Sequence, residues 1–227
     1  MMKKNIPIKE ACVESTDQAV NAERNGADRI ELCRNLDQDG LTPELDVIQN
    51  TMKSVNVPVK VMIRPRPGNF IYSHNEIKSM EQDIDLCKKL NVPELVIGIL
   101  TSSGNINTII TKRLASRAYP MAITFHKAID QTQDILYELD QLSKIQEISS
   151  ILTSGGEKTA IKGQSMLRKI IGQYGKRFDV IVAGSITHKN FDEIHGLINA
   201  QEYHGKILSY EHPLLKETRI NWRVFCL

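Results

Sequence analysis

The strongest constraint on the fold is a regular alternation of short apolar runs and longer helical patterns. Between consecutive runs lie segments with apolar residues at helical spacing, such as Leu45, Ile48 and Met52. Parallel strands need crossover connections of this kind, so the alternation predicts a parallel α/β fold. The eight runs fall at 8–15, 28–33, 58–65, 94–100, 121–129, 148–155, 179–186 and 201–208.

Two architectures satisfy this pattern, a closed (β/α)8 barrel and an open doubly wound sheet. A doubly wound sheet normally has a glycine-rich first turn, whereas the first turn here, "VESTDQ" (13–18), contains no glycine. We therefore predict a TIM (β/α)8 barrel. We expect the 227 residues to form a single domain, with a core at about 8–208 and a shortened or irregular C-terminal end at 209–227.

The composition excludes several classes of partner. A formal net charge of +2 gives no general affinity for nucleic acid or anionic membranes. The chain has no apolar run of about 18 residues and no apolar stretch typical of a signal peptide near its start, so we expect a cytoplasmic location and no membrane partner. Widely spaced cysteines argue against a disulfide scaffold. These cysteines are Cys12, Cys33, Cys87 and Cys226.

In a TIM barrel, functional side chains lie at the C-terminal ends of the strands. Strand alternation places an unusual number of polar residues on one face of these runs. Charged groups that converge inside a barrel need either mutual pairing or a ligand. The candidates are Glu10, Cys12, Arg29, Glu31, Cys33, Arg64, Arg66, Thr124, His126 and His204.

Arg64 and Arg66 lie two positions apart in "VMIRPRPGNF" (61–70), so both side chains point the same way. A structural ion pair of Arg64 with Glu31 is one interpretation. Arg66 lies about 6.6 Å further towards the rim, where its planar guanidinium suits a carboxylate or phosphate. The loop that follows carries Phe70 and Tyr72, and it is either a lid over the mouth or a packed surface loop.

Two strand ends carry small residues before a helix, "TSGG" (153–156) and "AGS" (183–185). Small residues let backbone N–H groups approach an anion, which makes Ser154, Gly155 and Gly184 candidate anion-binding residues. The alternative is that tight turns between strands and helices simply need glycine.

Histidine and cysteine supply the remaining candidates. His126 and, more weakly, His204 suit general acid–base chemistry if they face the mouth, although a buried structural histidine is the alternative. Cys12 and Cys33 occupy neighbouring strands at similar heights, where two thiolates suit a soft ion such as Cu(I). Small buried core cysteines are the alternative.

The chain contains the motifs "NAERNGADRIELC", "GLTP", "VMIRPRPGNFIYS", "TFHKAID" and "ILTSGG". Together they resemble the CutC family of copper homeostasis proteins, over about residues 8–208. The resemblance implies a TIM barrel, a cytoplasmic location and a homodimer or higher homo-oligomer. It also implies Cu(I) binding at Cys12 and Cys33.

Two functional hypotheses follow. The first is a copper homeostasis protein that binds or traffics Cu(I) in the cytoplasm. The alternative is an enzyme of unknown reaction that acts on a small anionic metabolite at the barrel mouth, and the residues leave open whether the chain is an enzyme. For the alternative, the anion-binding residues are Arg66, Ser154, Gly155, Gly184 and His204, and the catalytic residues are Glu31, Arg64 and His126.

Overall fold

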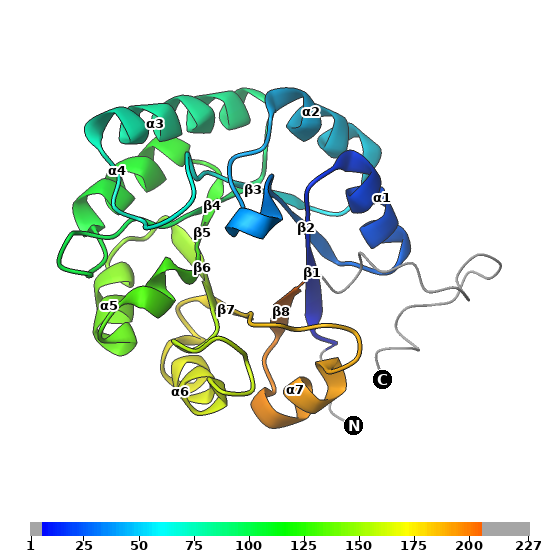
Figure 1. Ribbon diagram of the computed structural model, residues 1–227, viewed down its shortest axis with the longest axis vertical. Coiled ribbons are helices and arrows are strands. Elements are labelled where there is room, and N and C mark those ends of the chain that lie inside the picture. The colour runs from blue at the N-terminus through cyan, green and yellow to red at the C-terminus, as the bar shows by residue number, and fades with distance from the viewer. Residues whose placement is uncertain (1–5, 206–227) are drawn as a thin grey trace.

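The fold is a closed barrel of eight parallel strands, and the TIM barrel prediction is confirmed. A computed structural model describes residues 6–205. The strands pair in chain order from β1 to β8, and β8 pairs back onto β1. Within residues 6–205, seven α-helices form the outer ring around the strands (Figure 1). The irregular end predicted at 209–227 lies outside the described residues.

Each predicted apolar run contains one strand, and the strands are shorter than the runs. The residues just beyond the strand ends belong to the loops that carry the candidate site. The strands are β1 Ile8–Val13, β2 Arg29–Leu32, β3 Val59–Met62, β4 Glu94–Ile97, β5 Ala122–Phe125, β6 Ile148–Thr153, β7 Asp179–Val182 and β8 Glu202–Gly205. The α-helices are α1 Thr16–Arg24, α2 Leu45–Ser54, α3 His74–Lys89, α4 Thr108–Ala118, α5 Ile135–Leu142, α6 Gln164–Tyr174 and α7 Phe191–Ile198. Two 3-10 helices, η1 Leu36–Gln38 and η2 Lys127–Gln131, follow β2 and β5.

Local sequence signals fix the helix ends and faces. The Ser15 hydroxyl accepts a hydrogen bond from the Gln18 N–H at the start of α1. Ser73 and Glu76 form a capping box at the start of α3. The apolar stripes of the helices pack on the outer face of the sheet, where the main hydrophobic core lies.

The interior of the barrel is far more polar than this outer core. Glu10 lies beside Arg29 in the register of β1 and β2, and Cys12 lies beside Glu31. Residues paired in this way share a face, so these polar side chains all point into the barrel. Small apolar clusters fill the upper interior, the part nearest the C-terminal ends of the strands, and one of them lies around Met62.

An ion-pair network fills the lower interior, the part of the barrel nearest the N-terminal ends of the strands. Arg29 binds Glu10 (Nε–Oε2 2.5 Å) and Glu202 (Nη2–Oε2 2.6 Å). The buried Lys60 amino group lies 2.8 Å from Glu94 Oε1 and 3.3 Å from Glu10 Oε2. Each buried charge therefore has an opposite charge in contact, which is the condition for burying it.

No helix between residues 6 and 205 has both the length and the apolar character needed to span a membrane.

Candidate functional site

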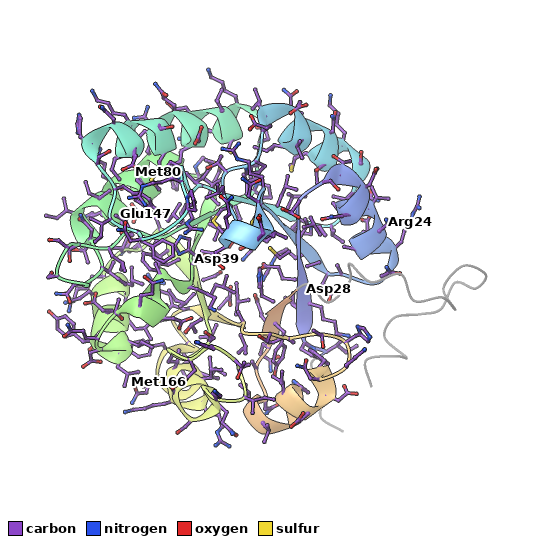
Figure 2. The ribbon with its side chains drawn as sticks, in the orientation of Figure 1. Arg24, Asp28, Asp39, Met80, Glu147 and Met166 are labelled. Carbon is purple, nitrogen blue, oxygen red and sulfur yellow. The ribbon has the colours of Figure 1, made fainter. Side chains whose placement is uncertain are left out.

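A cavity of about 850 Å³ opens at the C-terminal ends of the strands. The short turn η1 lies over the centre of the barrel (Figure 1), and Asp39, which follows it, is labelled there in Figure 2. Both Leu36 and Asp39 line the cavity. Inward-facing residues from most strands form its floor and walls. These are Cys12, Glu31, Cys33, Met62, Arg64, His126, Leu152, Ala183 and His204.

Two buried cysteines meet on the floor of this cavity. The Sγ atoms of Cys12 and Cys33 lie 3.9 Å apart. Glu31 Oε2 lies 3.2 Å from Cys12 Sγ and 3.5 Å from Cys33 Sγ. Both thiols are free, since a disulfide holds its sulfurs about 2.05 Å apart. The three side chains form a compact group that is able to hold one metal ion.

His204 places a positive charge beside these groups. Its Nδ1 lies 2.8 Å from Glu10 Oε1 and its Nε2 lies 3.7 Å from Glu31 Oε2. Burial alone lowers the pKa of His204, but the neighbouring charges of Glu31 and Cys12 and the hydrogen bonds to Cys12 and Glu10 raise it well above 6.5. The ring is therefore an imidazolium at neutral pH. It also joins the cavity floor to the ion-pair network below.

The two thiols differ in protonation. A hydrogen bond with Cys33 outweighs burial and, with His204, lowers the pKa of Cys12 to about 5. The same hydrogen bond, together with burial, raises the pKa of Cys33 well above 9. Burial raises the pKa of Glu31 to about 8. At neutral pH the two sulfur atoms therefore form one thiolate, at Cys12, and one thiol, at Cys33.

Arg64 is buried, but it does not pair with Glu31. Its Nη1 donates to the carbonyl oxygens of residues 38–40 at 2.9–3.1 Å, and its Nη2 donates to the Gly68 carbonyl at 2.9 Å. Among the described residues it has no carboxylate partner. The interpretation that Arg64 forms an ion pair with Glu31 is wrong, because the guanidinium donates instead to carbonyl groups of the loop after β2.

The structure also places Arg66 differently from the expectation. Its Nε binds Glu76 Oε1 at 2.5 Å, and its other donors reach the carbonyls of Pro67, Asn69 and Ile71. Arg66 does not line the cavity. The guanidinium thus organises its own loop and the start of α3, rather than standing free at the mouth for an anion.

The "TSGG" loop already holds a carboxylate, that of Asp130 in η2. The N–H groups of Ser154 and Gly156 each donate to Asp130 at 2.9 Å, and the hydroxyls of Ser154 and Thr153 also donate to it. The Gly155 N–H donates to Thr153 Oγ1. The loop therefore has the predicted anion-binding chemistry, but the chain itself supplies the anion, and Ser154 and Gly155 do not line the cavity.

Gly184 does line the cavity, and close packing accounts for it. Its φ of +111° is rare for residues with a side chain. A Cβ there would lie 2.7 Å from the backbone nitrogen of Ala160 and 2.9 Å from Ser154 Cβ. This placement favours the alternative interpretation, that the turn needs glycine.

His126 lies in the wall of the cavity and is neutral. Its Nδ1 accepts the Ala128 N–H at 3.0 Å, and its ring packs against Phe70 with centroids 4.8 Å apart. Gly98 makes room for the ring, since a Cβ there would lie 2.2 Å from His126 Cε1. Burial, helped by the charge of Arg64, lowers the pKa of His126 from 6.5 to about 3. In this environment the ring does not take up a proton near neutral pH.

We predict a pH-dependent contribution of His126 to stability. The unfolded chain takes up a proton at His126 below pH 6.5, whereas the folded protein does so only near pH 3. Stability is therefore lost as the pH falls from 6.5 towards 3, by up to about 1.4 kcal/mol per pH unit. Urea unfolding at pH 4–7 of the wild type and of His126→Gln measures this slope. The raised pKa of Glu31 changes stability in the opposite direction between pH 4.5 and 8, but it does so in both proteins. Parallel stability curves would contradict the prediction.

Comparisons with known proteins place this chain in one family. The family model described as "CutC family" matches residues 7–208. A human protein named copper homeostasis protein cutC homolog is 41% identical over 197 residues, which are 87% of this chain and 72% of the human protein. A protein of Histophilus somni, a family protein CutC, is 34% identical over 91% of this chain and 85% of its own length.

A solved structure shows the same architecture. The crystal structure of a CutC protein from Streptococcus agalactiae superposes with a TM-score of 0.83 at 29% sequence identity. The superposition covers 89% of this chain and 100% of that protein.

Proposed function

This chain belongs to the CutC family of copper homeostasis proteins, and we propose that it binds Cu(I) as cargo between the sulfur atoms of Cys12 and Cys33. The observation that carries this proposal is the separation of 3.9 Å between the two Sγ atoms on the cavity floor. The human relative is named as a copper homeostasis protein, which supports the same function.

The donor set fits a soft ion. Thiolates select Cu(I), and a metal–thiolate bond of about 2.3 Å, the length found for zinc, allows one ion to bridge sulfurs up to about 4.6 Å apart. The pKa of Cys12, lowered to about 5, makes it a thiolate before the ion arrives. Binding then releases the proton of Cys33, as metal ligation by thiols generally does. Glu31 is a neighbouring oxygen donor, the kind of ligand that Cu(I) uses least.

The site suits cargo that enters and leaves. Both cysteines line a cavity that opens at the C-terminal ends of the strands, which gives the ion a route towards them. Transfer of Cu(I) to a further protein belongs to this proposal. The cytoplasmic location and the homo-oligomeric state remain predictions.

The alternative function, an enzyme for a small anionic metabolite, has less support. Two of its expected anion contacts, Arg66 and the "TSGG" loop, are engaged within the chain. His204 faces the cavity, but it is surrounded by acidic groups. The catalytic roles expected for Glu31, Arg64 and His126 remain predictions.

Titration with Cu(I) under anaerobic, reducing conditions tests the proposal. We expect one Cu(I) per chain, and X-ray absorption is expected to show a first shell of two sulfur atoms. A first shell of only nitrogen and oxygen, or copper that a weak chelator removes completely, would contradict it.

A further inference from the structure

Two N–H groups in the wall of the cavity have no hydrogen-bond partner. They are Nε of Arg64 and Nε2 of His126, in side chains that are only 2% and 4% exposed. A neutral histidine whose Nδ1 accepts a hydrogen bond carries its proton on Nε2, so both atoms are donors. Folded proteins rarely leave buried donors unpaired, and such groups point to a missing partner.

The buried charge of Arg64 is also not neutralised. The acceptors of its Nη1 and Nη2 donors are backbone carbonyls, and the hydroxyl of Tyr72 is a further neutral group beside the guanidinium. By contrast, Arg29 and Lys60 in the lower interior each contact two carboxylates. A buried cation normally has an anionic partner, and within residues 6–205 the chain provides none for Arg64.

One aromatic ring contacts both donors' side chains. The Phe70 ring centroid lies 4.9 Å from Arg64 Cζ and 4.8 Å from the His126 ring centroid. Phe70 belongs to the long loop between β3 and α3 and lines the cavity. The two nitrogens are buried in this conformation, so a ligand reaches them only after neighbouring groups move, and the ring of Phe70 packs against both side chains.

We infer that the mouth is a binding site for a small organic carboxylate. The carboxylate displaces the ring of Phe70, and its oxygens accept hydrogen bonds from Arg64 Nε–H and His126 Nε2–H. Its charge neutralises Arg64. The site uses neither Cys12 nor Cys33, so it is separate from the proposed copper site within the same cavity.

The number of free donors favours a carboxylate over a phosphate. A carboxylate has two oxygens, which match two N–H groups, whereas a phosphate monoester presents three free oxygens and inorganic phosphate has four. The loop amides that typically complete a phosphate site are occupied by Asp130 here. The volume of about 850 Å³ lies in the range of small-molecule sites.

Ligand-observed NMR on the metal-free protein tests the inference, with acetate, pyruvate, malonate and citrate as probes and inorganic phosphate as the comparison. We expect saturation transfer to at least one carboxylate and a Tm that rises with its concentration. Phe70→Ala is expected to bind that probe about tenfold more tightly, because the ring no longer competes. His126→Phe, which fills the space but donates nothing, is expected to bind at least tenfold more weakly.

Each outcome decides the matter. Absence of binding in both the wild type and Phe70→Ala overturns the inference, as does unchanged binding in His126→Phe. Preferential binding of phosphate overturns the assignment to carboxylates. If His126→Phe does not fold, the gain expected in Phe70→Ala remains decisive. The Cys12→Ser/Cys33→Ser variant is expected to bind the carboxylate like the wild type, which separates this site from the copper site.

Discussion

A variant with serine at both Cys12 and Cys33 is expected to lose at least 100-fold in Cu(I) affinity. Groups that only support metal ligands already change affinity by about 10- to 100-fold when they are removed, and these two residues are the proposed ligands themselves. A hydroxyl is a hard donor and stays protonated at neutral pH, so it does not replace a thiolate for this ion. Competition with a Cu(I)-specific chromogenic chelator measures the loss.

The matched control is Cys87→Ser. Cys87 is buried on the inner face of α3, where burial raises the pKa of its thiol to about 12. It is a third free cysteine in the described part of the chain, but it lies outside the cavity lining. Its replacement is expected to leave Cu(I) affinity unchanged. Equal losses in the control and in the double variant would show that copper binds without a defined site.

The sequence was sufficient to predict the fold and the inward face of the strands. Eight apolar runs separated by helical patterns leave few arrangements, and the strand period of two places Cys12, Glu31, Cys33, Arg64 and His126 on one face. All five line the cavity. Periodicity is a local property, so it can be read from one segment without knowledge of its neighbours.

The partners of these side chains were harder to predict, because they come from distant segments. Arg64 and Arg66 share a face and a motif, but one is held by the carbonyls of residues 38–40 and the other by Glu76. Nothing in the spacing of the arginines shows which segment of the chain supplies the hydrogen-bond acceptors for each guanidinium. The signal for Arg66 was present in the capping box that begins α3, where Glu76 is the expected acidic residue.

The contacts of Asp130 and Lys60 were hard to predict for the same reason, because their partners lie in distant segments of the chain. "TSGG" has the composition of an anion loop, and it does bind a carboxylate, but sequence spacing does not show that Asp130 reaches it from η2. Lys60 lies in an apolar run and is fully buried. Its partners, Glu10 and Glu94, come from β1 and β4, so only closure of the barrel brings the three charges together.

Glu10 links the lower network to the cavity floor, which makes it the residue whose loss should destabilise the fold most. It contacts Arg29, Lys60 and His204, and burial leaves it almost no water to replace them. Removing one partner of a buried ion pair costs about 3–5 kcal/mol, because the opposite charge stays buried and unpaired. We expect Glu10→Ala to lose that amount in urea unfolding at pH 7.

The control for this loss is Arg117→Ala, which breaks a surface pair. Arg117 and Asp85 are each 42% exposed, and pairs of this kind contribute little to stability because water screens them. A loss in Glu10→Ala no larger than in this control would contradict the prediction.

The charge of Glu10 also makes the stability depend on pH. Burial raises the pKa of Glu10, but contacts with Lys60, His204 and Arg29 outweigh burial and lower this pKa well below 4.5. The stability due to its charge is therefore present above about pH 4.5 and lost as the pH falls through the lowered pKa. Glu10→Gln keeps the shape without the charge, so the stability curves of Glu10→Gln and the wild type should converge in acid.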